Sequence, residues 1–409
     1  MPKDNIVVGL DIGTHKIRTV IASVDERDIS PNVVGAGVSP SSGLRKGAIV
    51  DVDETISAIT ASLEDAERMS GSPIHHAVIA VGGTHLEAIN SRGVIAVPHG
   101  GEISAGDVDR VIEAAQAVNI QANRQILRVI PQNYTIDEQS GIRNPLGMKG
   151  VRLEVEAHII TGLAPALKNL ENAVHQSGVD VDEFIPAPLA AAESVLSKRQ
   201  KELGVVAIDI GSSSTGISVF EEGVVIASFV LPVGGDSVAN DIAIGLRTSV
   251  DVAEKLKIEY GTAKPADVSD RETIDLSAIS RADSQIVDRR QLAEIIHARY
   301  HEILSLVNEK LETIERDGQL PAGAVITGGG AKIPELIELA RETLSLPVQI
   351  GFPTGVDGVV DRIDDPAYAT AVGLIFFGAK GSSRSYSVGN VDFGRALDGV
   401  KNFFKKLLP

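Results

Sequence analysis

Two short segments carry residues suited to binding a phosphate anion. Residues 6–24 are IVVGLDIGTHKIRTVIASV, and residues 205–223 are VVAIDIGSSSTGISVFEEG. Each predicts a β-branched strand, the tripeptide Asp-Ile-Gly, a short polar turn and a second strand. Because a glycine at such a turn lets backbone N–H groups approach an anion closely, each segment predicts a phosphate-binding hairpin.

The side chains in the two turns suit a phosphate chain and its Mg²⁺ ion. Asp11 and Asp209 occupy equivalent positions and are placed to hold a hydrated Mg²⁺. Two such hairpins facing each other would grip a triphosphate from both sides. An ordinary hairpin turn explains one copy equally well, but two copies in register favour the binding site. The residues expected at the phosphates are Gly13, Thr14, His15, Lys16, Gly211, Ser212, Ser213, Ser214 and Thr215.

A glycine-rich segment, VITGGGAKIPEL, follows at residues 325–336. It predicts a strand, a loop of glycines and then a helix with Pro334 in its first turn. Bare backbone in such a loop lets a flat purine or an α-phosphate lie against the chain. Such a loop is a common connection between a strand and a helix. Its position after the second hairpin strengthens the prediction of a binding site. The expected binding residues here are Gly328, Gly329, Gly330 and Lys332.

The length and the repeat predict the architecture that positions these segments. A chain of 409 residues is too long for one ordinary core. Apolar residues make up 43% but aromatic residues only 3%, so the cores must be built from Val, Ile, Leu and Ala, which suits parallel sheets covered by helices. The repeated hairpin predicts two similarly folded halves.

Composition excludes several other classes of protein. The net charge of −17 and the lack of a basic stripe argue against nucleic acid as a partner. The absence of Cys excludes disulfides and Cys-based zinc sites. The sequence contains no run of about 18 apolar residues, so it predicts no membrane span. The first residues, MPKDNIVVGLDIG, lack the features of a signal peptide. We therefore expect a cytoplasmic protein.

Two Asp-Ile-Gly hairpins followed by a Gly-Gly-Gly loop resemble the actin, Hsp70 and sugar-kinase superfamily. The segments LPVGGDSVANDIAIGL (231–246) and DVAEKLKIEYG (251–261) resemble the FtsA family of bacterial cell-division proteins. PAPLAAAES (186–194) and AYATAVGL (367–374) resemble the two small-residue helices that link the halves in this superfamily. The resemblance implies an α/β, actin-like (ribonuclease H-like), two-lobed duplicated fold with an inserted α+β subdomain IC in place of IB.

The resemblance also implies roles and boundaries. Glu254 and Lys257 would reach the ribose and base of ATP, although a surface i,i+3 charge pair is the alternative. In the insert, Ser104 is expected to cap a helix at 104–118, with Asp107 three positions on. The expected parts are IA (1–83 and 163–203), IC (84–162), IIA (204–235 and 316–380), IIB (236–315), a flexible linker (381–391) and a membrane-targeting helix (392–409).

Two further positions concern chemistry. Relatives in the superfamily carry an acid or Gln before the proline of the first connecting helix, and this group positions the attacking water. Ala187 fills that place here, so we expect ATP binding with slow or absent hydrolysis. His297 and His301 are four residues apart on a predicted helix, but no third ligand has convincing spacing, so we interpret them as helix-surface residues rather than a metal site.

The chain ends in DFGRALDGVKNFFKKLLP, a basic and apolar segment on an acidic protein. Plotted on a helix, its apolar side chains fall within an arc of about 140°, with the charged ones opposite. This pattern predicts an amphipathic helix lying flat on anionic lipid, and packing on the protein's own core is the alternative. The expected membrane contacts are Phe393, Leu397, Val400, Phe403, Phe404, Leu407, Leu408, Lys401, Lys405 and Lys406.

The resemblance implies an ATP- and Mg²⁺-binding protein that polymerises at the inner membrane face and anchors the FtsZ ring there. Its partners would be the FtsZ C-terminal peptide on subdomain IIB, further copies of itself, anionic lipid and later division proteins. Three rivals fit less well. An actin-like type IV pilus adaptor lacks such a terminal helix, a small-molecule kinase needs a catalytic Asp that the first half lacks, and an MreB-like filament needs a IB insertion.

Overall fold

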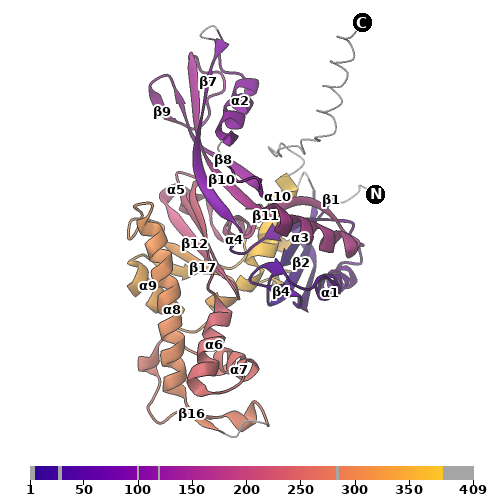
Figure 1. The fold of residues 1–409 in the computed structure, drawn as a ribbon, viewed down its shortest axis with the longest axis vertical. Helices are drawn as coiled ribbons and strands as arrows, with labels where there is room; N and C mark the ends of the chain where they lie inside the picture. Colours follow the sequence, from indigo (N-terminus) through magenta and orange to yellow (C-terminus); the bar gives the residue numbers. More distant parts are fainter. Residues whose placement is uncertain (1–4, 26–29, 99–100, 118–119, 282–284, 381–409) are drawn as a thin grey trace. The chain divides into compact units, whose positions relative to one another are not determined.

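The computed structural model (Figure 1) describes residues 5–25, 30–98, 101–117, 120–281 and 285–380. The predicted linker and C-terminal amphipathic helix lie outside these residues. Two sheets of mixed strand direction and one antiparallel sheet organise the described chain. Among the helices described, none is both long and apolar enough to cross a membrane.

Lobe I is built on a six-stranded sheet in the order β11-β6-β1-β2-β3-β19. β1 and β2 form the first Asp-Ile-Gly hairpin, β3 continues it antiparallel, and β6 and β11 run parallel to β1. A two-stranded hairpin, β4 (Leu44–Arg45) and β5 (Ala48–Ile49), follows β3. The main strands are β1 (Asn5–Ile12), β2 (Lys16–Val24), β3 (Asn32–Pro40), β6 (His76–Val81), β11 (Asp180–Pro186) and β19 (Asp357–Gly358).

Lobe II repeats this arrangement. Its sheet has the order β14-β13-β12-β17-β18, with the second Asp-Ile-Gly hairpin at β12–β13 and two strands running parallel to β12. Each sheet therefore places its hairpin, its third strand and its two parallel strands in the same order, and the predicted duplicated two-lobed α/β fold is confirmed. The strands are β12 (Val205–Ile210), β13 (Thr215–Glu221), β14 (Val224–Leu231), β17 (Ala324–Thr327) and β18 (Val348–Ile350).

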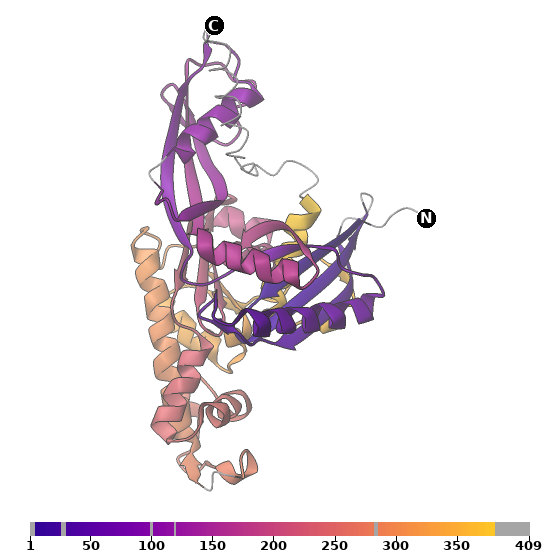
Figure 2. The ribbon, with the colours of Figure 1, turned by 45° about the vertical axis from the view of Figure 1, so that its right-hand side comes forward.

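Helices cover the sheets, and each lobe has its own aliphatic core. In lobe I, α1 (Val52–Ser70) packs on β2 and β3 (Figure 2). It begins at the cap Asp51, whose side chain accepts the Glu54 N–H, and ends at Gly71, where φ is 70°. The remaining helices outside the inserts are α3 (Ala164–Gln176), α4 (Ala187–Val195), α5 (Lys198–Leu203), α9 (Leu336–Leu344) and α10 (Ala369–Lys380).

The two predicted small-residue helices, α4 and α10, pack closely against each other. A Cβ added at Gly373 of α10 would lie 1.8 Å from the carbonyl oxygen of Ala190 in α4. Ser194 Oγ donates to the Ala369 carbonyl oxygen at 2.7 Å across the same contact. Only small residues permit this approach.

The lobe I insert is the predicted α+β subdomain. Its sheet has the order β7-β10-β8-β9, and α2 packs on it. Ser104 caps α2 as predicted, because its Oγ accepts the Asp107 N–H at 3.3 Å and its own N–H donates to the Asp107 carboxylate at 2.9 Å. The elements are β7 (Glu87–Ala96), α2 (Ala105–Gln116), β8 (Arg124–Ile136), β9 (Gln139–Ile142) and β10 (Arg152–Leu163).

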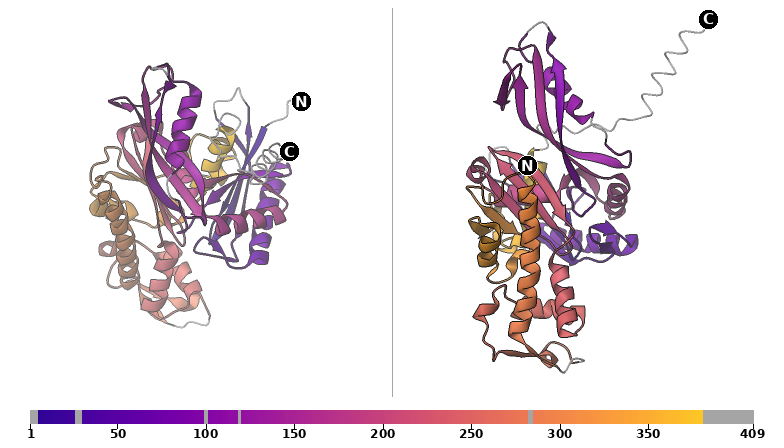
Figure 3. Two further views of the ribbon diagram at one scale, coloured as in Figure 1. Left: turned by 45° about the horizontal axis from the view of Figure 1, so that its top comes forward. Right: turned by 60° about the vertical axis from the view of Figure 1, so that its left-hand side comes forward.

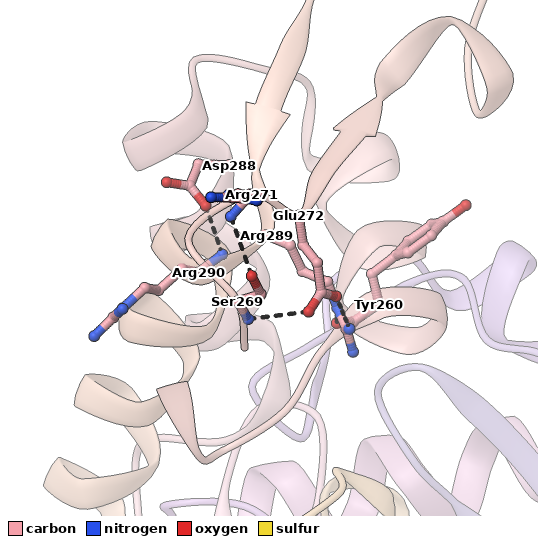
Figure 4. Close-up of polar contacts among 7 residues, drawn as sticks. All are labelled: Tyr260, Ser269, Arg271, Glu272, Asp288, Arg289 and Arg290. Atoms are coloured by element: carbon pink, nitrogen blue, oxygen red, sulfur yellow. Dashed lines mark hydrogen bonds and ion pairs between the residues drawn. The ribbon is translucent and has the colours of Figure 1, made fainter. Parts of the chain in front are cut away.

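The lobe II insert is mainly helical, and its long helix α8 runs beside α6 (Figures 1 and 3). A small polar network holds the loop before α8 (Figure 4): Glu272 accepts from Ser269 N–H at 3.0 Å and from Arg289 Nη1 at 2.5 Å. Asp288 caps α8 by accepting the Arg290 N–H. The elements are α6 (Gly235–Leu246), α7 (Val250–Tyr260), β15 (Thr273–Asp275), β16 (Ile286–Asp288) and α8 (Arg289–Glu312).

Candidate functional site

A cleft with a volume of about 510 Å³ lies between the two lobes. It brings together segments that are far apart in the sequence: both Asp-Ile-Gly turns, the glycine loop after β17 and one face of α7. The predicted nucleotide and metal residues that line it are Asp11, Gly13, Thr14, His15, Lys16, Asp209, Gly211, Ser212, Ser213, Ser214, Glu254, Lys257, Gly328, Gly329, Gly330 and Lys332.

The two hairpin turns face each other across this cleft. The hydroxyls of Thr14 and Ser213 are hydrogen-bonded at 2.9 Å. The Thr14 hydroxyl also accepts the Gly47 N–H from the β4–β5 hairpin at 3.2 Å. Both turns need glycine, because an added Cβ would lie 2.8 Å from the Lys16 carbonyl oxygen at Gly13 and 3.0 Å from that of Ser214 at Gly211. The two turns therefore have the opposed arrangement that the repeat predicts.

Asp11 and Asp209 place two carboxylates at the floor of the cleft. Burial raises the pKa of Asp11 to about 7; the nearby Arg18 charge opposes this shift and Asp209 adds to it. Burial also raises the pKa of Asp209 to about 6, against a hydrogen bond from Thr370 Oγ1 and the Arg18 charge. Carboxylates that are costly to ionise without a cation, beside hydroxyl donors, fit a hard oxygen-preferring ion such as Mg²⁺.

The glycine loop after β17 is shaped by two crowded positions and one open position. Gly328 has a φ of 85°, and a Cβ there would lie 2.3 Å from Asp209 Oδ1. A Cβ at Gly330 would lie 2.4 Å from Ile210 Cγ2, whereas nothing lies within 4 Å at Gly329. The buried Tyr300 hydroxyl donates to the Gly330 carbonyl oxygen at 2.8 Å. The loop is therefore held against the second hairpin, with bare backbone toward the cleft.

Charged side chains form the rest of the lobe II wall. Lys257 Nζ donates to the Gly235 carbonyl oxygen at 3.0 Å and to Glu254 Oε2 at 2.5 Å. The i,i+3 pair thus exists, but it lies in the cleft rather than on the outer surface of α7. Lys332 is paired with Asp365 at 2.5 Å.

Two details of the sequence prediction are wrong. Thr215 does not line the cleft, because it is the first residue of β13 and its buried hydroxyl donates to the Val233 carbonyl oxygen at 2.8 Å. Pro334 is not in the first turn of a helix: the glycines form a 3₁₀ turn, and α9 begins only at Leu336, after Glu335 adopts a left-handed φ of 64°.

Sequence reasoning also missed several residues that line the cleft: Arg18, Gly82, Gly83, His85, Asp236, Tyr300 and Thr370. Three of these had a signal in the sequence. Arg18 is the direct partner of Asp11 in the hairpin register, and Gly82 and Gly83 follow β6 as the three glycines follow β17. The others come from elements whose approach to the cleft depends on the tertiary fold.

The two histidines of α8 have other contacts. His297 Nδ1 is 2.8 Å from the Ala263 carbonyl oxygen, and its ring stacks on that of His301 with centroids 6.3 Å apart. In the part of the chain that the structure describes, no cluster of three metal-ligating residues was found.

Solved structures with the same fold define the class of this protein. Similarity extends to the PilM–PilN type IV pilus biogenesis complex (TM-score 0.68, 16% identity, 91% of this chain and 98% of that chain). It extends also to MreB5 of Spiroplasma citri bound to ADP (TM-score 0.55, 14% identity, 94% of this chain and 100% of that chain). The chain therefore has an actin-like fold.

Sequence comparison gives the family. A model of "Cell division protein FtsA" matches residues 206–373, and one of "SHS2 domain inserted in FTSA" matches residues 83–161. The cell division protein FtsA of Pseudomonas aeruginosa is 39% identical, over 94% of this chain and 91% of that protein. That of Bacillus subtilis is 39% identical, over 93% of this chain and 85% of that protein. The chain belongs to the FtsA family of cell division proteins.

Proposed function

We propose that this cell division protein binds ATP with Mg²⁺ in the cleft between its lobes. The observation that carries the proposal is the hydrogen bond between Thr14 and Ser213, which sets the two Asp-Ile-Gly turns opposite each other above Asp11 and Asp209. Backbone N–H groups and hydroxyls of both turns surround the phosphates. The glycine loop and the Glu254–Lys257 face of α7 receive the nucleoside.

Asp11 and Asp209 would hold the Mg²⁺ ion through its water shell, and the ion would neutralise phosphate charge. Hydrolysis is slow in this proposal. Ala187, at the start of α4, lines the cleft, and its methyl group can neither orient nor deprotonate a water molecule. Turnover of several ATP per second that Asp209→Ala abolishes would contradict this part.

The bound protein polymerises on the inner face of the membrane and anchors the FtsZ ring, whose C-terminal peptide docks on the lobe II insert. Family membership and the amphipathic pattern of residues 392–409 support this step. A single such helix binds lipid weakly, whereas a filament presents many helices at once and gains avidity. Lys401, Lys405 and Lys406 favour anionic lipid.

One experiment tests both halves of the proposal. The full chain, Asp209→Ala and a chain ending at residue 391 are compared for binding of a fluorescent ATP analogue and for sedimentation with anionic vesicles. We expect Asp209→Ala to weaken ATP binding measurably in Mg²⁺ buffer, because a carboxylate that would hold the metal is gone. We expect the shortened chain to leave the vesicles yet bind ATP normally. Filaments of the full chain on a lipid monolayer should be visible by electron microscopy.

Undiminished ATP binding by Asp209→Ala would overturn the nucleotide site. Unchanged sedimentation of the shortened chain would overturn the membrane anchor without affecting the nucleotide site.

A further inference from the structure

Arg18 lines the cleft, and part of its guanidinium is unpaired within the described residues. It stands on β2 directly opposite Asp11 in the hairpin register, and it lines the cleft. Its Nε is buried and has no hydrogen-bond partner. Within the described residues, its guanidinium makes no hydrogen bond or ion pair with any side chain. A guanidinium carries five N–H donors, and a buried donor without a hydrogen bond costs free energy.

The side chain is nonetheless held in place. Its guanidinium carbon lies 5.3 Å from the centroid of the Tyr368 ring, in a cation–π contact that joins lobe I to the segment before α10. Such stacking on one face leaves the edge of the planar fork free. A phosphate matches that edge with two parallel hydrogen bonds.

The surrounding acids do not serve as its partners. Burial raises the pKa of Asp11 and Asp209 and the Arg18 charge opposes that shift, and Arg18 also contributes to the lowered pKa of Asp365, so all three carboxyl groups feel its field. None of them lies within ion-pair distance of it among the described residues. Arg18 is thus a fixed positive charge beside the acids, in the region where the phosphates of a bound nucleotide would lie.

The equivalent position in lobe II has no such group. Gly216 stands opposite Asp209 as Arg18 stands opposite Asp11. A Cβ at Gly216 would lie 2.7 Å from Pro188 Cγ, so no side chain fits there. Of these two equivalent positions, only the one in lobe I therefore carries a positive charge.

We propose that Arg18 binds the phosphates of the nucleotide directly and supplies part of the positive charge that otherwise comes from the metal, so that ATP binds this chain without a divalent cation. The inference rests on the proposed ATP site and adds a residue and a metal dependence to it. Arg18 and the Asp-bound metal approach the phosphates from the same floor, and each partly compensates for loss of the other.

The test is the affinity of the full chain for a fluorescent ATP analogue, measured once with Mg²⁺ and once with EDTA. We expect Arg18→Gln to weaken binding about 10-fold or more in EDTA, the size of one charge-assisted hydrogen bond, but only about 3-fold with Mg²⁺. Arg18→Lys keeps the charge without the fork and should restore part of the EDTA affinity. Arg45→Gln removes the same charge from an exposed residue outside the cleft and should change neither value.

The outcomes separate the possibilities. An equal loss in both buffers, or no loss in either, overturns the inference while the ATP site stands. Failure of the unaltered chain to bind ATP in both buffers overturns the site and the inference together. Thermal melting without nucleotide identifies a misfolded Arg18→Gln, in which case the ratio of the two affinities for Arg18→Lys decides.

Discussion

The loop after β6 in lobe I differs from the equivalent loop after β17 in lobe II, although the strand order of the two sheets is the same. In lobe I, Gly82 and Gly83 follow β6, and Gly83 lies against the β4–β5 hairpin, with the Lys46 carbonyl oxygen 3.1 Å from an added Cβ. In lobe II, Gly328 follows β17 and lies against Asp209. Both glycine loops line the cleft, but the lobe I loop packs on the β4–β5 hairpin, whereas the lobe II loop packs against Asp209.

The hairpins show the same division. Both supply a glycine turn and a carboxylate, which the duplicated sequence places symmetrically. Lobe I adds cations, Lys16 and Arg18, whereas lobe II adds hydroxyls and has Gly216 where Arg18 stands in lobe I. The duplication accounts for the two opposed turns, and the unshared residues make the two sides of the cleft chemically different.

The inserts differ as well. The lobe I insert follows β6, and the sheet of the insert contacts lobe II. Gln132 Nε2 donates to the Val225 and Ile226 carbonyl oxygens at 2.9 and 3.0 Å. His158, on β10, is 2.8 Å from the Ser228 hydroxyl of β14. The insert thus interrupts lobe I in the sequence but is hydrogen-bonded to lobe II in the structure.

The largest expected effect separates the two glycine loops. Gly328→Ala places a Cβ against Asp209 Oδ1 at a left-handed φ. We expect it to cost about 3 kcal/mol or more of unfolding free energy and to remove most nucleotide affinity. Chemical denaturation and titration with a fluorescent ATP analogue measure the two effects.

Two variants are the controls. Gly83→Ala, also at a positive φ but less crowded, should cost about 1–2 kcal/mol and weaken nucleotide binding less than Gly328→Ala does. Gly329→Ala, with nothing within 4 Å of the new Cβ, should be close to neutral for stability. If Gly83→Ala weakens nucleotide binding more than Gly328→Ala does, the loops do not divide their roles as described.

A smaller effect concerns the fastening of the insert to lobe II. Burial lowers the pKa of His158 to about 4, from a usual value of 6.5. The ring is neutral when folded: Nδ1 donates to Asn90 Oδ1 at 2.6 Å, and Nε2 accepts from Ser228 Oγ. The unfolded chain binds the proton more tightly than the folded chain does. The contribution of the neutral ring to stability is therefore complete above about pH 6.5 and is lost as the pH falls toward 4.

We therefore expect the titration of His158 to lower the free energy of unfolding by about 2 kcal/mol as the pH falls from 7.5 to 5. His158→Gln cannot titrate, so its own loss over this range should be smaller by that amount. Because the raised pKa values of Asp11 and Asp209 act with the opposite sign in an overlapping range, only the difference between variant and unaltered chain isolates His158. Parallel pH profiles for the two proteins would show that the ring is not buried in solution.

Local chemistry explains which features the sequence predicted. The turn glycines, the Ser104–Asp107 capping box and the close crossing of α4 and α10 depend on residues near one another in the chain or on side-chain size alone. The similarity of the two halves followed from the repeated hairpin, because two copies of one segment predict two copies of one fold.

The missed features depend on tertiary contacts. His85 and Tyr300 reach the cleft from elements whose approach no local pattern encodes. The insert separates Gly82 and Gly83 from the rest of lobe I, which hid their equivalence to the loop after β17. The proposed boundaries of the subdomains and the roles of the site residues stay predictions. Thr215 failed for a different reason: at the first residue of a strand, a shift of one position turns a side chain to the opposite face.

The smallest expected effect compares a buried hydroxyl, that of Thr215, with a hydroxyl that lines the cleft, that of Ser213. Thr215→Val keeps the shape of the side chain but leaves the buried Val233 carbonyl oxygen without its donor, so we expect a loss of about 1 kcal/mol in unfolding free energy and unchanged nucleotide affinity. Ser213→Ala, two residues away, removes a hydroxyl that faces the cleft and bonds Thr14. It should leave stability almost unchanged and weaken nucleotide binding by a few fold. Denaturation and ATP-analogue titration of both variants measure this. If Thr215→Val lost affinity and Ser213→Ala lost stability, the second hairpin would be turned by one residue, and its hydroxyls would not oppose those of the first.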